Sequence, residues 1–230
     1  VGVNRNKESL IWVDLPSNLR IDGYPVTSIW GLGEIEKKGD ELVTSSLGDG
    51  LGLWLRSAVK IDGEVKVDGL LKRLLSIKGI RGLSWLDRYT LYKDVSFLAT
   101  KGVILETELP YQVTNKVKDV DGYEWRELNE AVFMWSRDLW PKEEIVNMGI
   151  KAEVFNVSDK PGKARIRARQ LESVGFRVVK VETGSEKSDK RCLAKVNFDM
   201  LKKNMFLEQI LRVYLGCEIE KGENLVFLVS

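Results

Sequence analysis

The chain has no histidine among its 230 residues and only two cysteines, so several classes of site cannot be built from it. Without imidazole there is no histidine base for catalysis and no histidine ligand for zinc. Two cysteines do not make the disulfide framework of small secreted domains. No run of apolar residues reaches the ~18 that a membrane-spanning helix needs. The formal net charge of +2 gives no global electrostatic argument for binding nucleic acid.

The rest of the composition is that of a soluble globular protein. Hydrophobic residues make up 43% of the chain and charged residues 30%, which is enough apolar material to bury a core. A length of 230 residues exceeds the usual size of one domain, so two domains are expected. The sequence contains no Gly-Lys-Ser/Thr phosphate loop and no Gly-x-Ser-x-Gly nucleophile motif. Composition alone therefore leaves the chemistry of the protein open.

Cys192 and Cys217 are interpreted as buried thiols, because free cysteine is among the most buried residue types. A disulfide between them stays open, since its geometry cannot be read from a sequence. The chain begins with Val1 and is already strand-like by Trp12. We interpret it as a fragment or a mature ectodomain, with room for a signal peptide or a membrane anchor upstream.

A change in charge marks the expected boundary between the two domains. Residues 147–230 contain 16 Lys and Arg against 11 Asp and Glu, a net of +5, and the remainder has 20 against 23, a net of −3. Pro141 and Gly149 flank this point, and both residue types interrupt regular structure. We therefore predict domains at residues 1–146 and 147–230, joined near residues 140–149.

The second domain alternates between strand-like and helix-like segments. Strands are expected at residues 150–157, 176–182, 192–196, 217–220 and 225–229. Residues 158–162 should open a first helix, with Pro161 in its first turn and Gly175 at its C-cap. A second helix should run over residues 200–215, capped by Asp199. The predicted fold class is α/β, with a small β-α-β-β-α-β-β C-terminal domain in which two helices pack on one sheet.

The first domain is less regular. Strands are expected at residues 10–15, 57–61, 65–67 and 103–109, and helices at residues 68–77, 83–100 and 128–136. Ser84 is the expected N-cap of the long helix, with Asp87 as its acidic partner. Residues 41–55 have a helical spacing that glycines interrupt. Gly31 and Gly33 are interpreted as breaks between elements.

The start of the second domain carries a family resemblance. Val154-Phe155-Asn156-Val157-Ser158 is followed by Pro161-Gly162-Lys163-Ala164, by Leu171, and by Gly175-Phe176-Arg177-Val178-Val179. This pattern resembles the LytR C-terminal domain family, whose members have an asparagine after the first strand, small residues in the helix and a Gly-aromatic pair at its end. The glycine that usually follows the asparagine is Val157 here. Because an asparagine side chain can close a tight strand-to-helix turn, the candidate motif loop consists of Asn156, Pro161 and Gly162.

Residues 10–24 resemble, more faintly, the start of a shortened and degenerate LytR-CpsA-Psr domain. Active members of that family resemble phosphotransferases, which move a glycopolymer from a polyprenyl-diphosphate carrier to the cell wall with a divalent metal, arginines and aspartates. The Arg-Asp pair of the family falls on Ser17 and Asn18, which supply neither the bidentate cation nor the metal-binding carboxylate. Arg20 alone keeps a positive charge at this end of the strand. The resemblance therefore implies a pseudoenzyme.

Basic residues alternate along the first helix of the second domain: Lys163, Arg165, Arg167 and Arg169. Residues four apart share a helix face, so an exposed basic ridge is predicted. With Arg20, these four are the candidate residues for binding an anion or a polymer. A solvated helix face that only balances the charge of the protein is the competing interpretation. Nucleic acid is not an expected partner, because no recognised motif is present.

The aromatic and acidic residues are interpreted as structural. All seven tryptophans precede residue 147 and could stack on sugars, but aromatic side chains dominate buried area, so Trp12 and Trp54 are expected in a core. Carboxylate pairs such as Glu34 and Glu36 have no recognisable catalytic partner and are interpreted as surface residues. No catalytic residue, metal site or cofactor is assigned.

The predicted function rests on the resemblance. We expect a non-catalytic protein of the bacterial cell envelope, extracytoplasmic and either membrane-anchored or secreted, that binds a cell-wall glycopolymer or an envelope protein. It would contact a membrane only through a segment outside this sequence. A wall-polymer phosphotransferase using Mg²⁺ is the first alternative. A structural scaffold in an envelope assembly, marked by an uncharged apolar surface patch, is the second.

Overall fold

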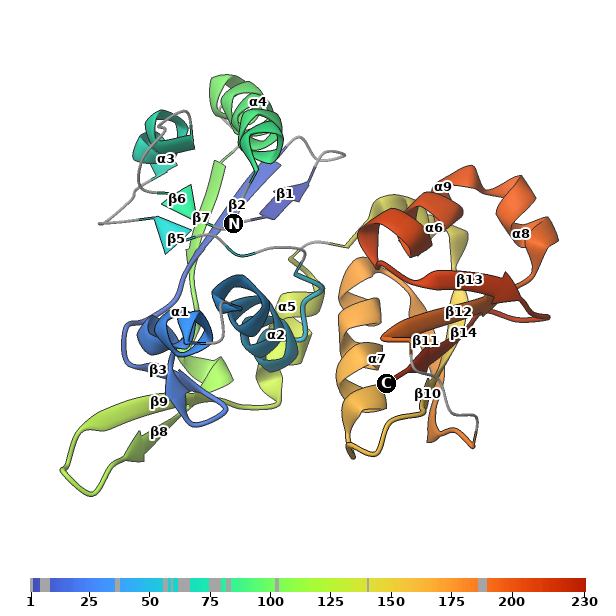
Figure 1. Ribbon diagram of the computed structural model, residues 1–230. Coiled ribbons are helices and arrows are strands. Elements are labelled where there is room, and N and C mark those ends of the chain that lie inside the picture. The colour runs from blue at the N-terminus through green and yellow to red at the C-terminus, as the bar shows by residue number, and fades with distance from the viewer. Residues whose placement is uncertain are drawn as a thin grey trace. The chain divides into compact units, whose positions relative to one another are not determined.

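The computed structural model describes residues 2–4, 9–35, 38–55, 58, 60–61, 67–74, 80–81, 84–101, 104–139, 141–185 and 190–230. These residues form a mixed α/β protein with helices and several sheets, so the predicted α/β class is confirmed (Figure 1). The chain divides into two compact units. The first contains Val1–Leu51 and Leu55–Trp135, and the second contains Gly52–Trp54 and Ser136–Ser230. Trp140, expected at the domain junction, lies outside the described residues.

The first unit contains a three-stranded sheet in the order β1 (Gly2–Asn4), β2 (Ser9–Asp14) and β7 (Ile104–Glu108). Two helices, α3 (Val67–Leu74) and α4 (Trp85–Lys101), share a buried apolar cluster with this sheet. The buried cluster consists of Leu10, Leu70, Leu74, Val95 and Leu98, with Trp12 packed against it. Ser84 caps α4 as predicted, because its Oγ accepts a hydrogen bond from the Asp87 N–H at 3.2 Å. A short ladder joins β5 (Lys60–Ile61) to β6 (Ile80–Arg81). Residues 62–66, including part of an expected strand, lie outside the described residues.

A second sheet of this unit has the order β4 (Tyr24–Pro25), β3 (Leu19–Ile21), β9 (Glu124–Leu128) and β8 (Thr114–Lys118). A 3₁₀ turn (Tyr111–Val113) precedes β8, and three helices complete the unit: α1 (Val26–Glu34), α2 (Gly39–Leu51) and α5 (Ala131–Arg137). The expected break at Gly31 and Gly33 is wrong, since both lie inside α1. A Cβ at Gly33 would lie 2.7 Å from the Cα of Gly39, so glycine here permits α1 and α2 to approach closely.

The second unit contains one five-stranded sheet with the order β11 (Arg177–Thr183), β10 (Lys151–Asn156), β14 (Val226–Val229), β12 (Cys192–Val196) and β13 (Glu218–Lys221). β10 runs parallel to β11 and β14, whereas β12 runs antiparallel to β14 and parallel to β13. The helices are α6 (Glu143–Met148), α7 (Lys163–Val174), α8 (Phe198–Lys203), α9 (Met205–Gln209) and a π-helical turn (Ile210–Tyr214).

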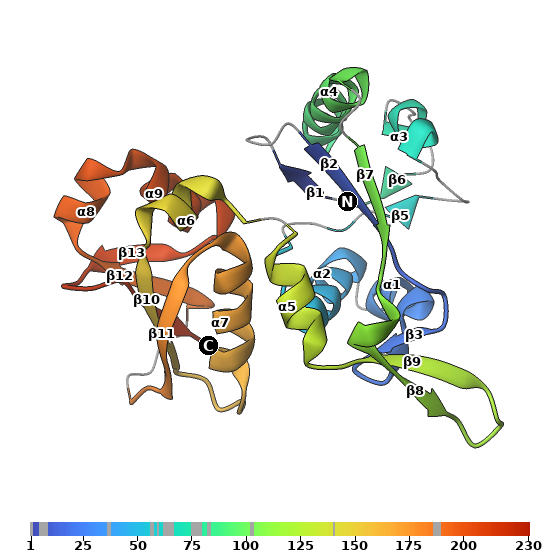
Figure 2. The same ribbon diagram turned by 180° about the vertical axis from the view of Figure 1, so that it is seen from behind.

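Helices cover one face of this sheet, as the two opposite views in Figures 1 and 2 show for α7. Alternate residues of the three central strands point into the helical layer: Ala152, Val154, Cys192, Ala194, Val196, Phe227 and Val229. Trp54 packs against the same core. The expectation that Trp54 is a core residue is therefore confirmed, but the core is that of the second unit.

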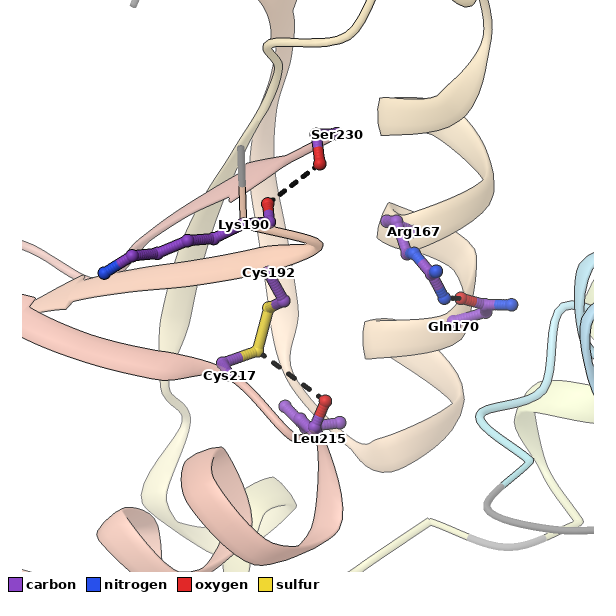
Figure 3. The surroundings of a disulfide bond; sticks show 7 residues. All are labelled: Arg167, Gln170, Lys190, Cys192, Leu215, Cys217 and Ser230. Carbon is purple, nitrogen blue, oxygen red and sulfur yellow. Dashed lines mark hydrogen bonds between the residues drawn. A yellow bond between two sulfur atoms is a disulfide. The ribbon is translucent and has the colours of Figure 1, made fainter. Parts of the chain in front are cut away.

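Three local expectations for the second unit are corrected by the structure. Pro161 lies in the turn before α7, which begins at Lys163. The second helix is not continuous, and Asn197 rather than Asp199 caps α8, because the Asn197 side chain accepts the Asp199 N–H at 2.8 Å. Cys192 and Cys217 are not thiols: they form a disulfide beside the sheet (Figure 3).

Candidate functional site

The loop between β10 and α7 is built around the side chain of Asn156, which is 5% exposed. Its Oδ1 accepts hydrogen bonds from the Ser158 N–H at 3.0 Å and the Ser158 hydroxyl at 2.7 Å. Its Nδ2 donates to the Lys160 carbonyl at 2.8 Å. One buried amide therefore holds both ends of the turn, as expected for an asparagine that closes a strand-to-helix connection.

This loop lies where three parallel strands end. β10, β11 and β14 are parallel, so their carboxyl ends share one edge of the sheet. At that edge the Gly184 N–H donates to the Asn156 carbonyl at 2.8 Å, and the Ser230 hydroxyl donates to the Lys190 carbonyl at 2.8 Å (Figure 3). In open α/β sheets this edge is where ligands usually bind.

The start of α7 concentrates positive charge. Gly162 is its N-cap with φ of 85°, a conformation that favours glycine, and no side chain caps the helix. No acidic residue lies in the first turn. Lys163 donates from Nζ to the Ser230 carbonyl at 3.0 Å, which brings its charge to the carboxyl edge of the sheet.

The four basic residues of α7 do not form one exposed ridge, which corrects that expectation. Only Arg165 is exposed, whereas Lys163, Arg167 and Arg169 are half-buried. The Arg167 guanidinium lies 4.8 Å from the Trp54 ring centroid, and one of its terminal nitrogens donates to Gln170 Oε1 at 2.6 Å. The Arg167 guanidinium therefore makes its contacts within the second unit.

Lys163 and Arg165 at the start of α7, together with Lys160 in the preceding turn, define a smaller surface, which we call the loop surface. Arg169 is half-buried further along the helix and is not part of it. Lys160 and Arg165 are exposed, and Asp159 is the one exposed acidic residue in the 157–162 loop. Positive side chains at a helix N-terminus face the positive end of the helix dipole, an unfavourable pairing that a bound anion relieves.

Arg20, the remaining candidate, lies in β3 of the first unit. Its guanidinium stacks 4.5 Å from the Trp125 ring centroid and pairs with Asp119 at 3.0 Å, leaving the side chain 19% exposed. The Val120 N–H and then Arg20 hold the pKa of the Asp119 carboxyl below its ordinary value of 3.8. Sequence reasoning missed Asp119 and Trp125, since both are about 100 residues away from Arg20 and no local pattern links them.

Ser17 and Asn18 occupy the turn between β2 and β3. Asn18 donates from Nδ2 to the Glu124 carbonyl at 3.1 Å, and its own carbonyl accepts the Arg126 N–H at 2.9 Å. Asn18 therefore fixes the register of β3 against β9.

No group of three or more Cys, Asp or Glu side chains is placed to hold a metal ion among the residues with assigned positions. Within the same part of the chain, no helix is long and apolar enough to cross a membrane.

Comparison with protein-family models, with curated proteins and with solved structures found no match to this chain.

Proposed function

We propose that the protein is a non-catalytic, envelope-associated protein whose second unit, a LytR C-terminal-like domain, binds an anionic cell-wall glycopolymer. In this proposal residues 1–146 are a degenerate LytR-CpsA-Psr-like domain and residues 147–230 are the LytR C-terminal-like domain. The resemblance in residues 154–179 supports the family, and the positive charge around the start of α7 supports the binding surface.

The observation that carries the proposal is the loop surface. Lys160, Lys163 and Arg165 lie within six residues of one another, at the carboxyl edge of parallel strands and at the uncapped start of α7. Asp159 is the one acidic residue beside them, so the local charge is three positive minus one negative, or +2. A repeating phosphate or carboxylate polymer can contact several such cations at once, which raises its affinity over that of a single anion.

The first unit supports a non-catalytic role. Asn18, which replaces a family carboxylate, is engaged in backbone hydrogen bonds. Arg20 is stacked on Trp125 and paired with Asp119, so its guanidinium is already engaged on one face and one edge. A diphosphate would have to displace that carboxylate to be held bidentately.

The disulfide supports an extracytoplasmic location. Structural disulfides persist in oxidising compartments and are rare in the bacterial cytoplasm. Cys192 and Cys217 are 7% and 3% exposed, which protects the bond from soluble reductants.

The proposal is tested by sedimenting the full chain with isolated cell walls that keep or have lost their anionic polymer. Lys160→Glu/Arg165→Glu should abolish binding to the intact walls, and Lys202→Glu/Lys203→Glu, an equal charge change on exposed residues of α8, should not. Binding that survives removal of the anionic polymer, or that both variants lower equally, would contradict the proposal.

The phosphotransferase alternative requires Arg20 and Asp119, which lie 3.0 Å apart, to exchange their mutual contact for contacts with a diphosphate and a metal. In that case the chain would bind a polyprenyl-diphosphate analogue only with Mg²⁺, and Arg20→Ala would abolish the binding. The loop-surface variants would leave it unchanged.

A further inference from the structure

Helix α4 is apolar on two opposite sides. Its inner side supplies Val95 and Leu98 to the core of the first unit. Its outer side exposes four large apolar residues: Trp85 at 59%, Leu86 at 72%, Tyr89 at 47% and Phe97 at 51%. A helix in a globular protein normally has one apolar side, so the second one requires an explanation.

The outer side also carries charge of a single sign. Lys93 and Lys101 are exposed there, and the Lys101 ammonium lies 4.4 Å from the Phe97 ring centroid. At about 100° per residue, positions 85, 86, 89, 93, 97 and 101 fall within roughly half of the helix circumference. We call these six residues the outer face of α4. Ser96, Thr100 and Thr90 also lie within that arc, and Asp94 and Asp87 lie just beyond its Lys101 edge.

The combination of residues is the one that suits a membrane interface. Tryptophan and tyrosine rings prefer the boundary between headgroups and acyl chains. Lysine can bury its stem there while its ammonium reaches lipid phosphates. The neighbouring helix α3 exposes two more cations, Lys72 and Arg73. A protein partner would need an apolar surface for the aromatic rings with acidic groups placed around it. An anionic bilayer has both, because its acyl chains are apolar and its headgroups carry negative charge.

We propose that the outer face of α4 binds the surface of a bilayer that contains anionic lipid. Trp85, Leu86 and Phe97 enter the acyl boundary, Tyr89 lies at headgroup level, and Lys93 and Lys101 contact the phosphates. This membrane contact lies within the chain itself and does not depend on the loop surface. The proposal differs from the expectation that a membrane is reached only through a segment outside this sequence.

The test is sedimentation of the full chain with vesicles of phosphatidylcholine alone and of phosphatidylcholine with phosphatidylglycerol. The chain should bind the mixed vesicles and lose binding as salt rises. Trp85→Ser/Leu86→Ser/Phe97→Ser should lower the partition coefficient by about tenfold or more, because three large side chains no longer leave water. Lys93→Glu/Lys101→Glu should lower the partition coefficient for the mixed vesicles by at least about tenfold.

The control is Val120→Ser/Met205→Ser, which removes two apolar side chains outside α4 that are still more exposed, at 99% and 82%, and should leave binding unchanged. Lipids brominated on their acyl chains should quench the tryptophan fluorescence of the bound protein, and Trp85→Phe should lose most of that quenching while it still sediments. Absence of binding to the mixed vesicles, or equal binding by the triple variant, would overturn the proposal. It would also be overturned if the triple variant changed the molar mass in solution, since the outer face would then join two copies of the chain.

Discussion

Reduction of the disulfide between Cys192 and Cys217 should destabilise the second unit by an amount that follows from its position in the chain. The bond joins the first residue of β12 to the residue before β13 and spans 25 positions. That interval contains α8, α9 and the π-helical turn. Closing a loop of this length removes about 3.5 kcal/mol of chain entropy from the unfolded state at 25 °C. The expected loss of unfolding free energy on reduction is therefore about 3.5 kcal/mol.

The assay is urea unfolding followed by far-UV circular dichroism, with and without a phosphine reductant. With the usual dependence of unfolding free energy on urea, the midpoint of the second unit should fall by roughly 1–3 M. Alkylation and mass measurement establish that the bond is formed before treatment and broken after it. An unchanged midpoint in fully reduced protein would refute the reasoning, and so would free thiols in the folded, untreated protein.

Three further predictions concern single residues. Arg165→Glu should raise the unfolding free energy by about 0.6–2 kcal/mol, because a negative charge replaces a positive one at the start of α7; the same variant should bind intact walls more weakly. Asn156→Ala should lower the unfolding free energy by about 1–3 kcal/mol, because it leaves the buried turn without its hydrogen bonds; thermal unfolding measures both variants. Asp119→Asn should remove part of the acid sensitivity of the first unit. The Asp119 carboxyl has a lowered folded-state pKa, so its stabilising effect is present above its unfolded value of 3.8 and is lost as pH falls below that value.

A specific result would contradict each of these predictions. A loss of stability in Arg165→Glu would show that the guanidinium has a structural contact of its own. An effect of Asn156→Ala no larger than that of Asn224→Ala, at an exposed turn position, would show that the motif loop does not need its amide. Identical pH profiles for Asp119→Asn and the unaltered chain would show that the contact with Arg20 does not persist in solution.

The parts of the fold that were predictable are those with a local cause. Gly175 ends α7 in the left-handed conformation at φ of 115°, where glycine is favoured, and its sequence position alone predicted this. Ser84 and Asn156 were predicted for the same reason: each satisfies backbone groups within four residues of itself. The start of α7 was predicted too early because the fixed φ of Pro161 suits either the first turn of a helix or the turn before it.

The parts that were missed depend on contacts distant in sequence. The sheet order of the second unit pairs β10 with β14, which follows it by some 70 residues, and no periodicity encodes that pairing. The disulfide and the stacking of Arg167 on Trp54 are of the same kind. The predicted ridge on α7 was too broad because helical spacing assigns faces but does not say which face another segment covers.

The central claim is that the chain binds polymer and does not bind the lipid-linked donor of a transferase. The most direct measurement is calorimetric titration of the full chain with a soluble anionic wall polymer and, separately, with a polyprenyl-diphosphate analogue and Mg²⁺. Our account predicts saturable heat with the polymer, weakened by Lys160→Glu/Arg165→Glu, and no saturable heat with the analogue. Binding of the analogue that requires Mg²⁺ and disappears in Arg20→Ala, with no binding of the polymer, would contradict the account.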